Sequence, residues 1–136
     1  MPAQVHAQAS APHMSAVAAA SVAAGALQLV TGYMPSTIAA AATPLVGHIW
    51  SALIILGGIT ILVGAWMRPV VLGLRLEAAG HMGLAAGITV YLAANLMWME
   101  SAWWVSPAVW WPFAFAVASV VRWAQIWHVM WRVRDV

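Results

Sequence analysis

Apolar residues dominate the chain in runs long enough to cross a membrane. A helix needs about 20 apolar residues to span a bilayer, and three runs reach that length: residues 46–67, 70–97 and 107–131. A fourth, alanine-rich run over residues 15–33 is weaker, because Gln28 interrupts it. The pattern predicts an all-α integral membrane protein, a four-helix transmembrane bundle with three strong spans and a weaker N-terminal one.

Turn and cap residues separate these runs. The segment 36–42 lies between two prolines and fits a short interfacial helix. Arg68-Pro69 marks the next turn, because proline disfavours helix in the residue before it. Ser106-Pro107 starts the last helix with a hydroxyl cap and a proline in the first helical position.

The N-terminal end allows two interpretations. Residues 1–13 are small and polar without a charged side chain, which predicts a mobile tail ahead of a single bundle over residues 14–136. A cleaved signal peptide is the alternative to a first span over residues 15–33. Signal peptides normally begin with positive charge, whereas the first basic residue here is Arg68, so a retained helix is favoured.

Composition supports the membrane and excludes other classes. Hydrophobic residues make up 65% and charged residues 6% of the 136 residues, against about 45–50% and about 25% in soluble domains. No cysteine is present, which excludes disulfides and thiolate sites. No catalytic triad, phosphate-binding loop, nucleic-acid patch or metal-ligand cluster is recognisable, so we expect neither an enzyme nor a bound metal or cofactor.

Arginine and tryptophan positions predict the orientation. Arg68, Arg75, Arg132 and Arg134 all fall on one side of a four-span protein, which the positive-inside rule makes cytoplasmic. The C-terminus would then lie in the cytoplasm of a bacterium with the protein in its inner membrane; without a first span, only the N-terminus changes side. Tryptophans predict interfacial belts: Trp50, Trp98, Trp103, Trp104, Trp110 and Trp111 on one face, and Trp66, Trp127 and Trp131 on the other, with Trp123 slightly deeper.

Two charged residues lie inside the apolar runs. Glu77 is roughly 10 Å and Arg122 roughly 13 Å from the cytoplasmic ends of consecutive, antiparallel spans, at about 1.5 Å per residue. We therefore predict a Glu77–Arg122 ion pair inside the bundle. Such a pair acts either as a structural clamp or in conduction or proton movement.

Other polar residues extend these positions into stripes. His81, four residues after Glu77, and Asn95, five helical turns after it, share its face of the helix. Ser119 and Gln125 flank Arg122 at three-residue spacing on the last span. His81 is also a candidate haem ligand, but His48 and His128 lie at other depths, which leaves only a haem shared across a dimer. We expect a histidine hydrogen-bonded within the stripe.

Small residues form a packing surface on the third span. Ala79, Gly83 and Gly87 recur every four residues on a face away from Glu77, and small residues at that spacing let helices approach closely. Gly57, Gly58 and Gly64 offer a similar surface on the second span. Packing within the chain and self-association into a homo-oligomer remain equal alternatives.

The chain resembles small multi-pass membrane proteins of actinobacteria and their phages in two segments. One is Arg68-Pro69 with Gly73-Leu74-Arg75-Leu76-Glu77-Ala78-Ala79-Gly80, and the other is the Trp- and Arg-rich helix from Arg122 to Arg134. Some of those proteins are holin-like, although this chain lacks the strongly charged C-terminal tail usual in holins. The resemblance implies a self-associating protein that permeabilises the inner membrane. The alternative is a small transporter, channel or accessory subunit that uses the Glu77, His81 and Arg122 stripe. The lipid bilayer is the expected partner.

Overall fold

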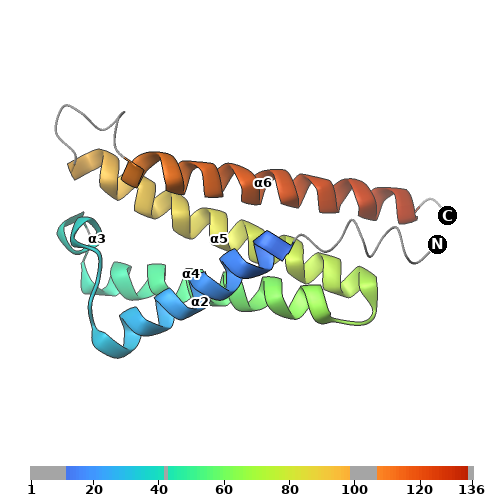
Figure 1. Ribbon diagram of the computed structural model, residues 1–136, viewed down its shortest axis with the longest axis horizontal. Coiled ribbons are helices and arrows are strands. Elements are labelled where there is room, and N and C mark those ends of the chain that lie inside the picture. Colours follow the sequence, from blue (N-terminus) through green and yellow to red (C-terminus); the bar gives the residue numbers. More distant parts are fainter. Residues whose placement is uncertain (1–11, 42, 99–106, 135–136) are drawn as a thin grey trace.

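Helices are the only regular secondary structure in the described part of the chain. A computed structural model describes residues 12–41, 43–98 and 107–134, and these contain no strand (Figure 1). The predicted tail and the turn with Glu100, Trp103 and Trp104 lie outside the described residues, except that Pro12 and His13 already belong to the first helix. The elements in chain order are α2 (Pro12–Thr31), α3 (Ser36–Ala41), α4 (Pro44–Trp66), α5 (Val70–Trp98) and α6 (Pro107–Arg134).

Local residue chemistry explains where these helices begin and end. Gly32 follows α2 with φ of 66°, the left-handed conformation that commonly ends a helix. Thr43 caps α4 by accepting a hydrogen bond from the backbone N–H of Val46, and Pro44 occupies the first helical position. The predicted span began at Val46, two residues late, because the Thr-Pro start was missed.

Three of the helices are long and apolar enough to cross a membrane. They include α2 from Met14 to Thr31, all of α4, and α6 from Pro107 to Arg132. The protein is therefore an all-helical chain with at least three candidate membrane spans. The remaining long helix, α5, has 29 residues and carries Glu77, His81 and Asn95.

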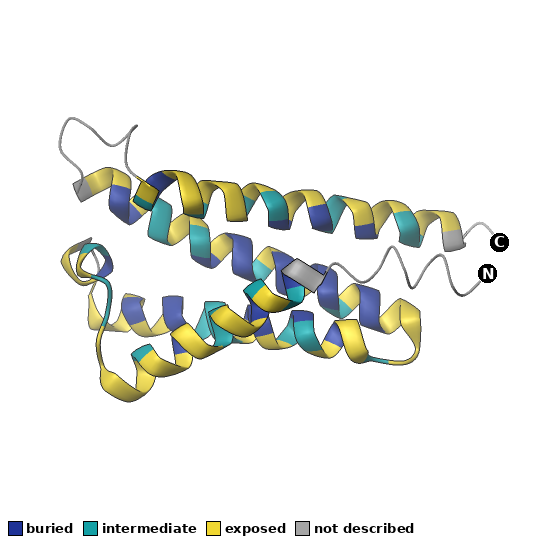
Figure 2. Ribbon diagram, viewed as in Figure 1, coloured by how far each residue is buried: buried dark blue, intermediate teal, exposed yellow. Residues whose placement is uncertain are grey.

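The long helices pack in the order α2, α4, α5 and α6. In Figure 1, α6 lies along the side of α5 opposite to α4, and α2 crosses α4 obliquely. The short helix α3 covers one end of α5 with Ile38. Buried residues gather where the helices meet, whereas the outer surfaces of α2 and α6 are largely exposed and apolar, as a lipid-facing surface would be (Figure 2).

The α4–α5 contact is built on four glycines, which we call the glycine seam: Gly57 and Gly64 on α4, and Gly73 and Gly80 on α5. A Cβ atom on Gly64 would lie 2.5 Å from the backbone nitrogen of Glu77 and 2.6 Å from the carbonyl oxygen of Gly73. A Cβ atom on Gly80 would lie 2.7 Å from the carbonyl oxygen of Gly57. The two backbones touch, which only residues without a side chain permit.

Trp50 continues the seam at the same seven-residue spacing. Its indole Nε1 donates a hydrogen bond of 2.8 Å to the carbonyl oxygen of Gly87, and its ring stacks on Tyr91 with centroids 6.0 Å apart. Trp50 is buried. The indole therefore packs inside the chain instead of facing lipid headgroups, and the interfacial depth of Trp50 stays a prediction.

Candidate functional site

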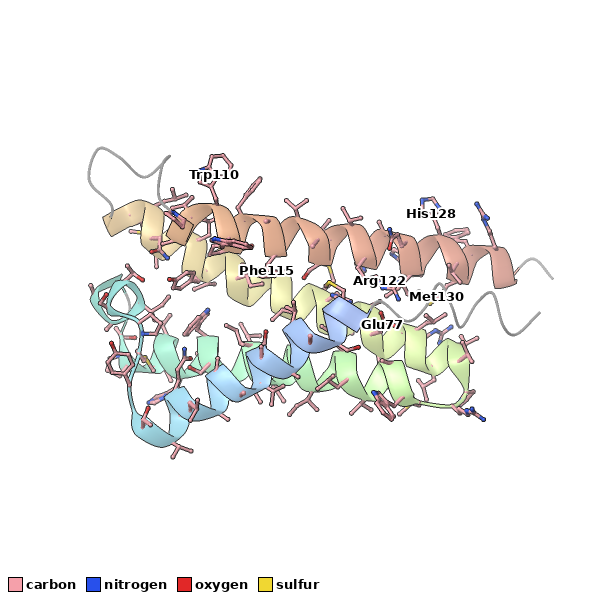
Figure 3. The ribbon with its side chains drawn as sticks, in the orientation of Figure 1. Glu77, Trp110, Phe115, Arg122, His128 and Met130 are labelled. Atoms are coloured by element: carbon pink, nitrogen blue, oxygen red, sulfur yellow. The ribbon has the colours of Figure 1, made fainter. Side chains whose placement is uncertain are left out.

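Close packing at the glycine seam positions Glu77. Because α5 lies directly against α4 at Gly64, the backbone of Glu77 contacts α4, and its side chain projects towards α6 (Figure 3). There Leu74 and Ala78 of α5 pack with Ile126 of α6 in one apolar cluster. The carboxylate is thus enclosed between α4, α5 and α6.

Arg122 meets this carboxylate from α6. Its Nε lies 3.0 Å and its Nη2 2.9 Å from Oε1 of Glu77, so both donors converge on one oxygen. Glu77 is 4% and Arg122 8% exposed. The predicted ion pair is present, and its charge-assisted hydrogen bonds offset part of the free energy of burying both ions.

His81 lies one turn further along α5 without a hydrogen bond. The ring is fully buried, and neither nitrogen has a partner within the described residues. Its Nε2 is 3.8 Å from Oε1 of Glu77, which is too far for a hydrogen bond. The expected hydrogen-bonded histidine in the stripe is therefore not found, since Arg122 occupies the near oxygen of the carboxylate.

Ser119 is the second buried polar residue without a partner. It is 1% exposed on the face of α6 that meets α5, one turn from Arg122, and its Oγ has no hydrogen bond in the described part of the chain. Unsatisfied buried polar atoms are rare in native proteins. Each member of the ion pair thus has an unsatisfied polar side chain one turn away on its own helix: His81 on α5 and Ser119 on α6.

The other members of the predicted stripes lie elsewhere. Asn95 is buried as expected, but far along α5, where its Nδ2 donates to the carbonyl oxygen of Tyr91 at 2.8 Å. Gln125 is exposed, so its place in the buried stripe of α6 is wrong. Each step of three residues along a helix turns the side-chain direction by about 60°, so the two steps from Ser119 to Gln125 turn it by about 120°. The buried face of α6 instead continues from Arg122 to Ile126.

The predicted small-residue surface is divided between two environments. Gly83 and Gly87 face α4, where Cβ atoms would lie 3.6 Å from Cα of Gly57 and 3.0 Å from Cγ1 of Ile54. Ala79 is exposed. Within the chain, two of the three positions are therefore covered, and Ala79 alone remains available to a neighbour.

The topology arginines gather at one end of the bundle. Arg68 lies in the α4–α5 connection, Arg75 in the second turn of α5, and Arg132 near the end of α6, and all three are exposed. Figure 1 shows this connection and the end of α6 on the same side of the molecule. The side chain of Arg134 lies outside the described part.

A polar contact that the sequence did not suggest joins the weakest span to the bundle. The hydroxyl of Ser51 donates a 3.1 Å hydrogen bond to Oε1 of Gln28, linking α4 to α2. Gln28 was interpreted only as an interruption of the apolar run. Polar side chains in membrane helices commonly hydrogen-bond across to another helix, so Gln28 itself could have predicted a polar partner on a neighbouring span.

The histidines and acidic residues of the described chain lie apart from one another, except for Glu77 and His81. Across residues 12–41, 43–98 and 107–134, no three His, Asp or Glu side chains come together as metal ligands. His48 and His128 are exposed, whereas His81 is fully buried.

The chain matches no protein-family model, no curated protein and no solved structure.

Proposed function

We propose that this chain is a bacterial inner-membrane protein with four crossings, and that Glu77, His81 and Arg122 form the polar centre of a proton-conducting pathway. Three apolar helices support the membrane assignment directly. The 29 residues of α5 exceed the length needed for a crossing, and its side chains Glu77, His81 and Asn95 are buried within the bundle. The exposed arginines at one end support a cytoplasmic C-terminus.

One observation carries the assignment to conduction. A pair that only clamps two helices accounts for Glu77 and Arg122 but gives no role to a third buried polar group. His81 lies beside the pair with both ring nitrogens unsatisfied. Unpaired polar groups inside a membrane bundle are expensive and typically line a pathway for ions or protons. Carboxylate and imidazole side chains such as those of Glu77 and His81 can take up and release a proton, whereas the arginine side chain only donates hydrogen bonds.

Flux through reconstituted vesicles tests this function. Wild-type protein in liposomes with an internal pH-sensitive dye should discharge an imposed proton gradient. His81→Leu should slow that discharge by about tenfold or more, because it removes the polar side chain at the centre. Gln125→Leu, which removes an exposed polar group from α6, should leave the rate unchanged. Wild-type vesicles no leakier than empty ones would sink the proposal.

A second candidate, holin-like self-association, is favoured by the open side of the bundle. Ala79 and the outer face of α6, including Val117 and Val120, are exposed. A second copy could pack there as readily as lipid does. Inducible expression in a bacterium, with culture density and membrane potential followed together, tests this role. Abrupt, timed loss of potential that Ala79→Leu abolishes would support it, and normal growth at high membrane expression contradicts it.

A further inference from the structure

The imidazole of His81 needs a hydrogen-bond partner that the described residues do not supply. A neutral imidazole has one N–H donor and one acceptor nitrogen, and both are unsatisfied here at full burial. The nearest acidic group, Glu77, already receives both Arg122 donors on the oxygen that faces the ring. The missing partner must therefore come from outside the pair.

Ser119 lacks the local hydrogen bond that four other hydroxyl side chains make in the long helices, as does Thr37 in the short helix α3. Serine and threonine inside a helix usually donate to the carbonyl oxygen four residues earlier. Four hydroxyls of this chain do so: Ser21 to Val17, Thr31 to Leu27, Thr60 to Leu56 and Thr89 to Ala85. Ser119 makes no such bond although it is 1% exposed. Its hydroxyl is thus free to serve another acceptor.

The register of α5 and α6 places these two residues at the same level. The helices run in opposite directions (Figure 1), and the contact between Glu77 and Arg122 aligns them. His81 lies four residues beyond Glu77, and Ser119 three residues before Arg122, in the same direction along the bundle. At about 1.5 Å per residue, the two differ in depth by roughly 1.5 Å.

We infer that a water molecule bridges His81 and Ser119 beside the Glu77–Arg122 pair. Water is the smallest molecule that donates and accepts at once, and buried waters typically bond two to four otherwise unsatisfied polar groups. The imidazole and the hydroxyl offer both kinds of partner. The inference rests on the proposed function for the pathway that this water would serve, while the bridge itself is measurable without any flux.

Solid-state NMR of the full chain in phospholipid bilayers tests the bridge. Replacing the other histidines, His6, His13, His48 and His128, by asparagine leaves one ¹⁵N-labelled imidazole. Magnetisation should pass from water to the His81 ring nitrogens about threefold or more faster than to the backbone amide of Leu84, because an amide in an apolar cluster one turn away has no water neighbour. Equal, slow transfer to both would overturn the inference.

Ser119→Ala provides a second measurement that does not depend on spectral assignment. If water binds the hydroxyl, the substitution should lower transfer to His81 by about threefold and destabilise the folded protein. If the hydroxyl is unsatisfied, alanine should be neutral or stabilising, and that result also overturns the bridge. Ser21→Ala, which removes a hydroxyl bonded within its own helix, is the matched control. Wild-type protein that gives the water signal but conducts no protons would refute the proposed function and leave the bridge standing.

Discussion

Replacing Gly64 by alanine tests the closest approach between α4 and α5. The new Cβ would lie 2.5 Å from the backbone nitrogen of Glu77, whereas ordinary contacts begin at 3.4 Å. The obstructing atoms belong to the backbone, so no side-chain rotation relieves the contact, and the helices must separate by about 0.9 Å. Overpacking of this kind destabilises proteins by about 1–3 kcal/mol.

Gly83→Ala is the matched control on the same interface. Its Cβ would meet only Cα of Gly57 at 3.6 Å, an ordinary van der Waals distance. Alanine is favoured over glycine inside a helix by up to about 1 kcal/mol. The two variants share that gain, so Gly64→Ala should be less stable than Gly83→Ala by about 2 kcal/mol, a factor of about 30 in the unfolding equilibrium constant.

Reversible unfolding in mixed lipid–detergent micelles measures this difference. Tryptophan fluorescence follows unfolding as the fraction of dodecyl sulfate rises, and ten tryptophans give a strong signal. The Gly64→Ala variant should also weaken the Glu77–Arg122 pair, because Glu77 moves with the backbone of α5. Equal stability of the two variants would refute the backbone-contact argument.

Three further contacts are tested by substitution in the same micelles. Glu77→Gln or Arg122→Gln alone leaves a buried charge without its partner and should destabilise the folded protein by about 3–5 kcal/mol. The double variant should recover part of that loss. Strictly additive effects of the two substitutions would contradict a direct pair. Trp50→Phe keeps an aromatic ring but removes the indole donor, which should lower stability by about 0.5–1.5 kcal/mol; no change would mean that the hydrogen bond contributes nothing. Ser51→Ala leaves the amide oxygen of Gln28 without its donor, which should weaken the contact between α2 and α4 by about 0.6 kcal/mol. Amide hydrogen exchange in α2 should therefore become faster while α5 stays protected. Unchanged exchange in α2 would count against the interhelical link.

The ion pair was predictable because depth in a helix depends only on residue number. A constant rise per residue and a short connection between antiparallel helices were enough to bring Glu77 and Arg122 to one level. Their contact in the structure follows from that arithmetic. The same argument failed for Gln125, because depth alone says nothing about the direction in which a side chain points.

The glycine seam was not predictable, since the chain offers more small residues than the interface uses. Eight glycines lie on α4 and α5, and any of several faces could have formed the contact. Rotation of each helix about its axis selects Gly57, Gly64, Gly73 and Gly80. That rotation depends on the sum of contacts along both helices, including the stacked Trp50.

The sequence alone determines where the helices lie, through the lengths of its apolar runs and the residues that end them. Hydrogen bonds within a helix are local, and a helix crosses a bilayer when its apolar run is long enough. Charge positions likewise determine which ends share a side. The tertiary structure alone decides which polar groups find partners. Arg122 satisfies Glu77, while His81 and Ser119 are left unsatisfied, because partnership depends on distances of a few tenths of an ångström between helices, and these are set by packing.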